Sequence, residues 1–292
     1  MSKGITVLSL FDGISCGRVA LDRASIKVDK YIASEIDKDA IKVSSSNWPS
    51  IIHSGCVTKL NSKNLPKIDM IIGGSPCQGF SVSGNQLALN DSRSKLFLDY
   101  VRLLNECKPK YFLLENVKMK IEFVDLISKY LGVKPIEINS SLVSAQNRVR
   151  LYWTNIPGVT QPIDKKILLK DIIDNNGPYE YVHEDCYKNG KIRGTFWQYD
   201  CSNRGHESQG YRAYFLNSKI GCLNHSAPSM SKIMTDSGVR KTTRLEHERL
   251  QNIPDGYTSS VALNKAKSLL GNGWTVDIIS HIFSFLPGNW KK

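Results

Sequence analysis

The sequence predicts an α/β fold with a mostly parallel sheet, joined to a smaller region of a different texture. In the first half, short apolar segments at residues 5–10, 30–34 and 68–72 alternate with helix-like segments. Such alternation is typical of a parallel sheet covered by helices on both faces. From about residue 156 the chain is rich in Gly, Asn, Ser, Tyr and Lys and has no long helical period. This change predicts a loop-rich, largely β region.

The other elements follow in chain order. Helices are expected from about Ser15 and from Asp37, and then over residues 92–105, 122–130, 244–251 and 276–285. Further strands are expected over residues 111–114, 134–138, 149–154 and 211–215. The pattern predicts a catalytic and cofactor-binding domain over residues 1–156, a second domain over residues 157–243, and a return to the first domain over residues 244–292.

Composition limits the classes of function. The 292 residues are 41% hydrophobic and 23% charged, which is enough to bury a core. Lys and Arg exceed Asp and Glu by 39 − 27 = 12, an imbalance that favours a polyanion such as nucleic acid. A lysine-rich solvated surface is the alternative. No segment is apolar over the length that spans a bilayer, and no signal peptide is evident, so no membrane partner and a cytoplasmic location are expected.

Cysteine and histidine spacing argues against a metal centre. The seven cysteines form an odd set with wide gaps and no C-x-x-C pair, so neither a disulfide framework nor a zinc site is expected. Histidines 183, 206 and 225 also lack ligand spacing. The sequence therefore predicts reduced thiols and no metal.

One cysteine lies where α/β folds place their chemistry. Cys77 sits in Gly-Gly-Ser-Pro-Cys-Gln-Gly-Phe-Ser, just beyond the carboxyl end of the strand at residues 68–72. The glycines permit unusual backbone angles and Pro76 fixes the backbone before the thiol. A buried packing cysteine is the alternative. A nucleophilic thiol needs cationic or acid/base partners from elsewhere in the chain.

Two other strand ends offer a cofactor site. The strand at residues 5–10 ends in Phe11-Asp12-Gly13 and opens a helix, as in nucleotide-type cofactor sites, although a simple tight turn is the alternative. The G-x-G-x-x-G dinucleotide pattern is absent. Glu35 follows the second strand, where such folds place an acceptor for a ribose hydroxyl.

The last three candidate site residues carry a charge. Glu115 ends an apolar strand and could act as a proton donor, with a helix-capping or salt-bridging carboxylate as the alternative. Arg148 and Arg150 lie two apart on an expected strand, so both are predicted to point to one face. Two guanidinium groups on one face suit an anion or a base carbonyl, and solvated arginines on an edge strand are the alternative.

Together these segments resemble the DNA cytosine-5 methyltransferase family. The resemblance covers almost the whole chain, and the motifs keep the family's order. They are Phe11-Asp12-Gly13, Pro76-Cys77-Gln78, Glu115-Asn116-Val117, Gln146-x-Arg148-x-Arg150, residues 244–251 with Pro254-Asp255, and Gly271-Asn272-Gly273-Trp274-Thr275-Val276. The residues of the first and last motifs most resemble those of the family branch that contains animal de novo enzymes and phage and bacterial orphan methylases.

The resemblance implies a Rossmann-like methyltransferase domain, with residues 157–243 as a target-recognition domain. The implied activity is that of a DNA (cytosine-5-)-methyltransferase (EC 2.1.1.37). Cys77 would add to C6 of a flipped cytosine, Glu115 would hold N3 and the exocyclic amine, and Arg148 would hold the base carbonyl. Gln146 and Arg150 complete the implied catalytic set. The loop at residues 78–91 would be a lid, with a surface loop as the alternative.

The resemblance also implies S-adenosylmethionine as methyl donor and S-adenosylhomocysteine as product. The residues expected to hold the donor are Phe11, Asp12, Gly13, Ile14, Glu35, Ile36, Cys56, Val57, Ser75, Pro76, Leu96, Asn272, Trp274 and Val276. The family usually has Gly-Asp where this chain reads Gly55-Cys56. Because a thiol is a weak acceptor, this difference puts the affinity for the donor in doubt.

Double-stranded DNA is the partner that the resemblance implies, with an association with the nucleoid. Residues expected to contact DNA are Gln78, Ser81, Gln86, Arg193, Trp197, Arg204, His206 and Arg212. A restriction-modification system with a cognate restriction endonuclease is left open. The alternatives are a tRNA cytosine-5 methyltransferase, a catalytically inactive DNA-binding regulator and a nicotinamide oxidoreductase.

Overall fold

The computed structural model describes residues 4–76, 92–198, 209–225 and 231–292, and the chain forms two compact units. The first unit comprises Met1–Ile138, Val149–Gln161 and Val276–Lys292, and the second comprises Asn139–Arg148 and Pro162–Thr275.

These units divide the chain differently from the predicted domains. Residues 244–275 were expected to return to the first domain, but they belong to the second unit, and only Val276–Lys292 returns. Asn139–Arg148 also joins the second unit, although it precedes the predicted boundary.

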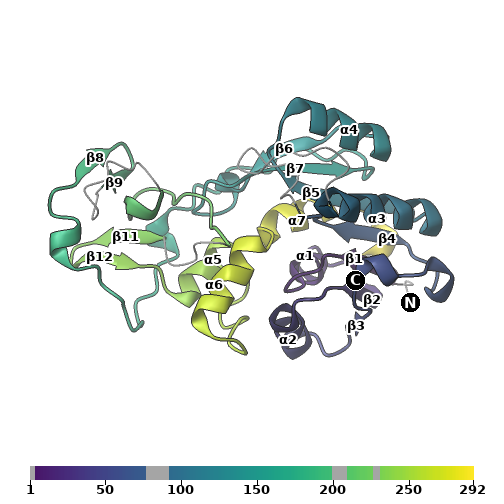
Figure 1. Cartoon of the computed structure of the whole chain (residues 1–292), viewed down its shortest axis with the longest axis horizontal. Helices are drawn as coiled ribbons and strands as arrows, with labels where there is room; N and C mark the ends of the chain where they lie inside the picture. The colour runs from purple at the N-terminus through teal and green to yellow at the C-terminus, as the bar shows by residue number, and fades with distance from the viewer. Residues whose placement is uncertain (1–3, 77–91, 199–208, 226–230) are drawn as a thin grey trace. The chain divides into compact units, whose positions relative to one another are not determined.

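A seven-stranded sheet forms the centre of the first unit (Figure 1). Its order is β3-β2-β1-β4-β5-β7-β6. The strands are β1 (Ile5–Leu10), β2 (Val28–Ser34), β3 (Ile52–His53), β4 (Met70–Gly73), β5 (Tyr111–Val117), β6 (Ile136–Asn139) and β7 (Val149–Thr154). The pairs β1–β2, β1–β4, β2–β3 and β4–β5 are parallel, and β5–β7 is antiparallel. The predicted mostly parallel sheet is therefore confirmed.

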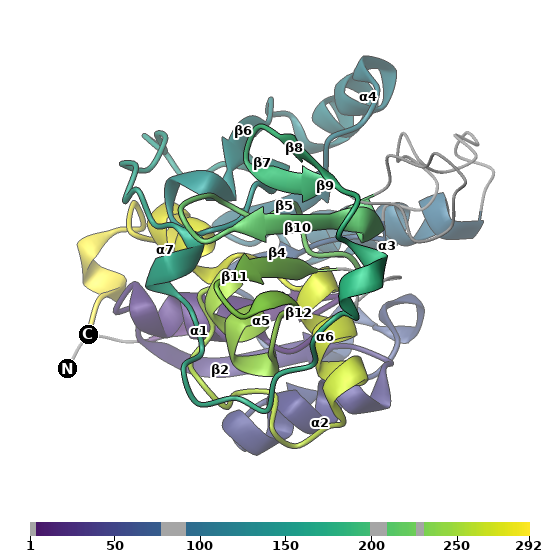
Figure 2. The same ribbon diagram turned by 90° about the vertical axis from the view of Figure 1, so that its left-hand side faces the viewer.

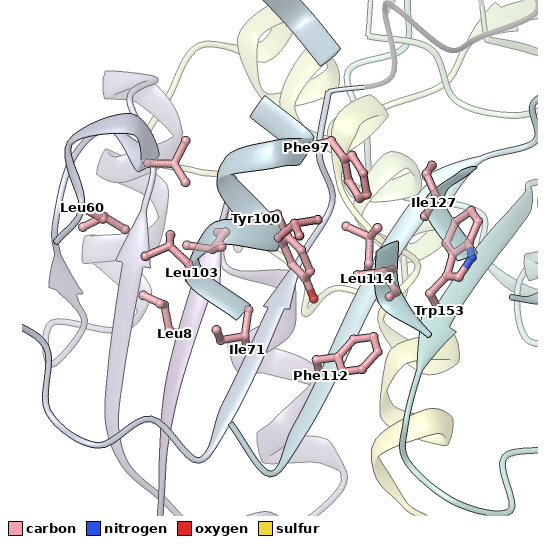
Figure 3. Close-up of a cluster of buried hydrophobic side chains, with 14 of the residues drawn as sticks. Leu8, Leu60, Ile71, Phe97, Tyr100, Leu103, Phe112, Leu114, Ile127 and Trp153 are labelled. Atoms are coloured by element: carbon pink, nitrogen blue, oxygen red, sulfur yellow. The ribbon is translucent and has the colours of Figure 1, made fainter. Parts of the chain in front are cut away.

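One face of this sheet is covered by α3 (Ser92–Cys107) and α4 (Ile121–Leu131). Alternate strand residues point to this face, because successive side chains in a strand point to opposite sides. The helices contribute large side chains to the same buried cluster (Figure 3). Its labelled members are Leu8, Leu60, Ile71, Phe97, Tyr100, Leu103, Phe112, Leu114, Ile127 and Trp153.

Three more helices belong to the first unit. They are α1 (Cys16–Arg23), α2 (Lys38–Asn47) and α7 (Val276–Phe283). Helices α1 and α7 pack against each other, and an ion pair between Arg23 and Asp277 joins them. Helix α2 begins after Asp37, whose carboxylate accepts hydrogen bonds from the backbone amides of Asp39 and Ala40.

The second unit holds a smaller sheet in the order β12-β11-β10-β9-β8 (Figure 2). Its strands are β8 (Lys191–Arg193), β9 (Phe196–Gln198), β10 (Arg212–Phe215), β11 (Lys232–Thr235) and β12 (Gly238–Lys241). All pairs are antiparallel except β10–β11. The predicted smaller β region is therefore confirmed.

Helices α5 (Arg244–Leu250) and α6 (Leu263–Asn272) complete the second unit. The sequence pattern predicted α5, but α6 was not predicted, and the structure shows that a helix is present there. Ala266, Leu269 and Leu270 are buried at the spacing of one helical face, and this spacing was the available signal.

Two classes of feature are missing from the part of the chain that is described. Within the described ranges, no helix has the length and apolar character needed to cross a membrane. Among the same residues, no group of three or more His, Cys, Asp or Glu side chains is placed to hold a metal ion.

Gly73, the last residue of β4, provides a test of the packing beneath the candidate site. A Cβ at this position would lie 2.7 Å from the Leu10 carbonyl oxygen and 3.2 Å from Cε2 of Tyr100. Because the nearest atom belongs to the backbone of β1, Gly73→Ala should lower the free energy of unfolding by about 1–3 kcal/mol. Urea unfolding measures this change.

Gly288→Ala is the matched control, because a Cβ there would meet no atom within 4 Å. This control should stay within about 0.5 kcal/mol of the parent. Equal stabilities of the two variants would contradict close packing between β1 and β4.

Candidate active site

The turn after β1 has an unusual backbone. Phe11, Gly13 and Ser15 have φ angles of 57°, 58° and 61°. Left-handed backbone is uncommon for residues other than glycine, and it persists where the surrounding structure imposes it. The turn therefore requires support from its neighbours.

Asp12 supplies this support. Its buried carboxylate accepts hydrogen bonds from Ser9 Oγ at 2.6 Å, from the Tyr31 hydroxyl at 2.7 Å and from Ser15 Oγ. Ser15 Oγ also lies 2.6 Å from Ser44 Oγ on α2. Asp12 was predicted to contact the cofactor, but its carboxylate is engaged by hydroxyls of the protein. We therefore revise its role to support of the turn.

Glu35 connects the same turn to the start of α2. One carboxylate oxygen accepts from the Gly13 amide at 2.8 Å, and the other accepts from the amides of Ile36 and Asp37 at 2.7 and 2.9 Å. An ionised carboxylate can accept about four hydrogen bonds, so one more donor can be accommodated. The adjacent Ile36 side chain is 71% exposed, which is high for an isoleucine. The end of β2 thus combines an acceptor with an uncovered apolar surface.

The segment after β3 carries a thiol, at Cys56, rather than a carboxylate like that of Glu35. Ser34 Oγ donates to the Gly55 carbonyl at 2.7 Å, which fixes the turn before Cys56. The Cys56 thiol lies 3.1 Å from Thr58 Oγ1, and this hydrogen bond lowers the pKa of Cys56. Val57 and Ile14 were both predicted to contact the cofactor, but their side chains are buried in the core.

The ends of β4 and β5 are linked directly. Nδ2 of the buried Asn116 donates to the carbonyl and to Oγ of Ser75, at 3.3 and 3.2 Å. The backbone immediately before Pro76 is thereby tied to β5. Sequence reasoning assigned no role to Asn116, although its position beside Glu115 at a strand end was a usable signal. Cys77 lies outside the described residues.

Glu115 and Arg150 form an ion pair at the carboxyl end of β5. Arg150 Nε lies 3.1 Å from Glu115 Oε1, and the two side chains are only 14% and 11% exposed. In the antiparallel pairing Glu115 faces Tyr152, and Arg150 lies two residues away on the same face. The pairing of β5 with β7 therefore brings these two side chains together.

Arg148 has a different environment from Arg150. It directly precedes β7 and is 3% exposed, and its guanidinium donates to protein acceptors in residues 222–223 and 271–273. Arg148 therefore lies outside the strand that was expected to carry both arginines, and its acceptors are protein atoms, whereas Arg150 lies beside Glu115. A contact of either arginine with a ligand stays a prediction.

The Gln146 side chain also makes its hydrogen bonds to other residues of the protein. Its Nε2 donates to the Leu250 carbonyl at 2.7 Å and to Gln251 Oε1 at 3.0 Å, and its Oε1 accepts from the Leu223 amide at 3.3 Å. The side chain is fully buried. The side chain therefore links residues 146, 223 and 250–251, and its catalytic role stays a prediction.

Most of this site lies within residues that match a known protein family. The C-5 cytosine-specific DNA methylase family matches residues 5–125, which hold the turn after β1 and the ends of β2, β4 and β5. The type II methyltransferase M1.ScrFI of Lactococcus lactis subsp. cremoris is 28% identical over 305 residues, covering 94% of this chain and 76% of that protein. M.NlaX of Neisseria lactamica is 27% identical and covers 94% of both chains. The match to the C-5 cytosine-specific DNA methylase family thus covers residues 5–125, and these type II methyltransferases are similar to nearly the whole chain.

A phage protein and a solved structure extend the comparison. The orphan methyltransferase M.Rho11sI of Bacillus phage rho11s is 36% identical over 210 residues, which are 66% of this chain and 39% of that protein. The structure of the Entamoeba histolytica methyltransferase EhMeth superimposes with a TM-score of 0.80 at 18% identity, covering 99% of this chain and 100% of that one. At this identity, the likeness to EhMeth concerns the fold alone.

The residues expected to read DNA are in varied surroundings in the second unit. Arg193 is exposed on β8, whereas the Trp197 indole donates to the Tyr187 carbonyl at 2.8 Å. Arg212 lies over the Phe196 ring at 4.7 Å. The remaining expected contacts, Gln78, Ser81, Gln86, Arg204 and His206, lie outside the described residues.

The remaining residues that were expected to hold the cofactor differ in exposure. Asn272 ends α6 with an exposed side chain, and Trp274 follows with a partly exposed one. Val276 is fully buried at the start of α7, and Leu96 packs against the core. The side chain of Val276 is therefore closed to a ligand, and contacts of Asn272 and Trp274 with a cofactor stay predictions.

The buried Asp12 predicts a pH-dependent stability. Burial raises the pKa of Asp12 from 3.8 to about 6, so between these values the folded chain binds more protons than the unfolded chain. The contribution of Asp12 is therefore fully present below about pH 4 and is lost as pH rises through about 6. Relative to Asp12→Asn, the parent should lose up to about 3 kcal/mol between pH 4 and pH 7.

Urea unfolding of both proteins across this range measures the difference. Asp125→Asn, at an exposed position on α4, is the control and should show no such trend. A difference between parent and Asp12→Asn that stays flat with pH would refute the assignment.

Proposed function

We propose that the chain is a DNA (cytosine-5-)-methyltransferase (EC 2.1.1.37) that uses S-adenosylmethionine and forms a covalent adduct through Cys77. The main support is the Glu115–Arg150 pair, placed by β5 and β7 beside a β4 end that leads directly into Cys77. A carboxyl group and a guanidinium at hydrogen-bonding distance suit the N3 and O2 edge of a pyrimidine.

The first unit offers groups that fit part of S-adenosylmethionine. Glu35 can accept a further donor, as a ribose hydroxyl requires, and exposed Ile36 offers an apolar surface to a planar base. Phe11 and the amides of the Gly13 turn complete this edge. When bound, S-adenosylmethionine supplies an electrophilic methyl group, and S-adenosylhomocysteine is the product. The thiol of Cys56 stands where the family usually has a carboxylate, so we expect weaker recognition of the adenine amino group.

The proposed chemistry begins with the Cys77 thiolate. Its sulfur adds to C6 of the cytosine, and the electrons of the C5–C6 double bond move to make C5 nucleophilic. A proton shared between the Glu115 carboxyl group and N3 offsets the negative charge that develops on the ring. After C5 gains the methyl group, a base removes the C5 proton, the double bond forms again, and the Cys77 thiolate leaves.

Arg150 has two tasks in this scheme. Its Nε orients the Glu115 carboxyl group, and we assign the same guanidinium, whose Nη1 donates to the Val149 carbonyl at 2.8 Å, the contact with the base carbonyl. This assignment replaces the predicted role of Arg148. The target carbon is flanked by stacked neighbours in a duplex, so the cytosine must leave the helix to reach these groups.

Duplex DNA is the proposed substrate. The net charge of +12 favours a polyanion, and the curated relatives are type II and orphan methyltransferases. We propose the second unit as the DNA-reading part, with exposed Arg193 on β8 among the contacts. A cytosine in tRNA is the competing substrate, because the same side chains would perform the same chemistry on it.

Methyl transfer from labelled S-adenosylmethionine tests this proposal. The chain should label duplex DNA and leave tRNA unlabelled, and Cys77→Ser should abolish the labelling because an alcohol is a far weaker nucleophile than a thiolate. Bisulfite sequencing of DNA from cells that express the chain should then reveal methylated cytosines in a fixed sequence. Labelling of tRNA alone would shift the substrate to RNA, and labelling of neither would refute the proposed function.

The Glu115–Arg150 pair gives a second prediction. Glu115→Gln and Arg150→Met should each lower kcat by about 10²–10³-fold, the usual effect of removing a group that stabilises developing charge. The double variant should lose less than the product of the two single losses, because the two side chains act as one unit.

Lys129→Met, at an exposed position on α4, is the control and should retain the parental kcat. Single-turnover rates measure the effect on the chemical step. Fully multiplicative losses would show that the two side chains act independently, contrary to the proposal.

A further inference from the structure

Asn116 is a buried polar side chain at the carboxyl end of β5, and both ends of its side-chain amide are hydrogen-bonded. The Val117 backbone amide donates to Asn116 Oδ1 at 2.8 Å, which directs Nδ2 toward Ser75. Nδ2 donates to the Ser75 carbonyl at 3.3 Å and to Ser75 Oγ at 3.2 Å. Because Asn116 and Ser75 are only 2% and 5% exposed, bulk water does not compete for these hydrogen bonds.

These hydrogen bonds lie just beyond the backbone pairing of β4 with β5. The parallel register pairs Gly73, the last residue of β4, with Leu114. Asn116 is two residues beyond Leu114 on one strand. Ser75 is two residues beyond Gly73 on the other. The Asn116 side chain thus continues the link between the two strands after their backbone pairing has ended.

Asn116 and its neighbour Glu115 point to opposite faces of the sheet, as successive residues of a strand do. Asn116 is paired with Leu151, a member of the buried cluster that includes side chains of α3 and α4. Glu115 is paired with Tyr152 and forms its ion pair with Arg150 on the other face. One strand end therefore carries the carboxyl group of the candidate site and also holds the segment that follows β4.

The backbone before Cys77 is restricted at two consecutive residues. Ser75 is held by Asn116, and the proline that follows Ser75 favours extended backbone at this position. The ring of Pro76 then fixes its own φ near about −65°. Ser75 and Pro76 are the last described residues before Cys77. The direction in which the chain leaves Pro76 therefore depends on the hydrogen bonds of Asn116.

We propose that Asn116 is a positioning residue for the Cys77 thiolate. It holds Ser75 so that the sulfur meets C6 of the cytosine at the required distance and angle, and it contacts neither the base nor S-adenosylmethionine. This proposal rests on the proposed function, which assigns the nucleophile to Cys77. A displacement of about 1 Å from the reactive geometry can lower a rate by about 10²-fold. Loss of the Asn116 donor should therefore slow the chemical step and leave ligand binding unchanged.

Single-turnover methylation of duplex DNA at saturating S-adenosylmethionine provides the first test. Asn116→Asp keeps the size of the side chain and the acceptor for Val117, but it loses both hydrogen bonds to Ser75. Its rate should fall by about 10–10²-fold. Its KM for DNA and its Kd for S-adenosylmethionine should stay within about threefold of the parent. Ser75→Ala loses the hydroxyl acceptor but keeps the carbonyl, so its rate should fall less.

Asn155→Ala is the matched control, because Asn155 bonds the backbone at the opposite end of the same strand. Its Oδ1 accepts from the Phe112 amide at 2.9 Å, and its Nδ2 donates to the Lys110 carbonyl at 3.0 Å. This variant should unfold at a lower urea concentration than the parent, as Asn116→Asp should, but it should retain the parental rate. The control thus separates a loss of stability from a loss of positioning.

Hydrogen exchange in the absence of any ligand provides the second test. The amides of Gly74 and Ser75 should exchange faster in Asn116→Asp than in the parent, and those of β1 should be unchanged. Unaltered exchange at these two amides, a parental rate of methylation in Asn116→Asp, or an equal loss of rate in Asn155→Ala would overturn the proposal. A weaker affinity for S-adenosylmethionine with a parental rate would also overturn it. If Asn116→Asp does not fold, a parental rate in Ser75→Ala decides against the proposal.

The two proposals fail in different ways. If the parent chain transfers no methyl group to duplex DNA or to tRNA, the proposed function fails and the positioning role of Asn116 fails with it. If the parent is active and Asn116→Asp keeps the parental rate, the proposed function stands and Asn116 only stabilises the fold.

Discussion

The parallel alignment of β1, β2, β4 and β5 is the constraint on which the candidate site depends. Parallel strands end at the same edge of a sheet, and here those ends carry the turn at Phe11, the acceptor Glu35, the segment that leads to Cys77, and Glu115. The absence of a Cβ at Gly73 allows this alignment, because the Leu10 carbonyl lies where a larger side chain would begin. The sheet thus sets the spacing between the segments that carry the candidate catalytic and cofactor-binding residues.

The loops at this edge contain residues with left-handed backbone or are hydrogen-bonded to neighbouring strands. Buried polar side chains hold these loops in place. Asp12 offsets left-handed backbone at Phe11 and Ser15 with three hydroxyl donors, and Asn116 ties the segment before Cys77 to β5. A buried carboxylate with a raised pKa destabilises a fold at neutral pH, so Asp12 holds the turn at a cost in stability. Stability and positioning therefore involve the same side chains.

The sequence predicted those parts of the structure that follow from local pattern. The strand at Val149–Thr154 and the positions of Glu35 and Glu115 at strand ends follow from apolar runs and the residues that end them. The hydrogen bonds of Arg148 could not be predicted in this way. Its partners at Gly271 and Gly273 are more than 120 residues away in the chain, and the period-two rule applies only to residues inside a strand, whereas Arg148 precedes β7. Helix α6 was missed although its spacing was visible, and the compact units follow long-range packing that no local change in composition reports.

The central claim is that the Cys77 thiolate forms a covalent bond with cytosine at the edge defined by these strands. Incubation of the chain with S-adenosylmethionine and duplex DNA that contains 5-fluorocytosine tests it, because fluorine at C5 blocks the elimination that would release the thiol. Peptide mass spectrometry should locate the DNA adduct on Cys77, with none on Cys56. An adduct on Cys56, or no adduct with DNA that the chain methylates when it carries ordinary cytosine, would contradict the account.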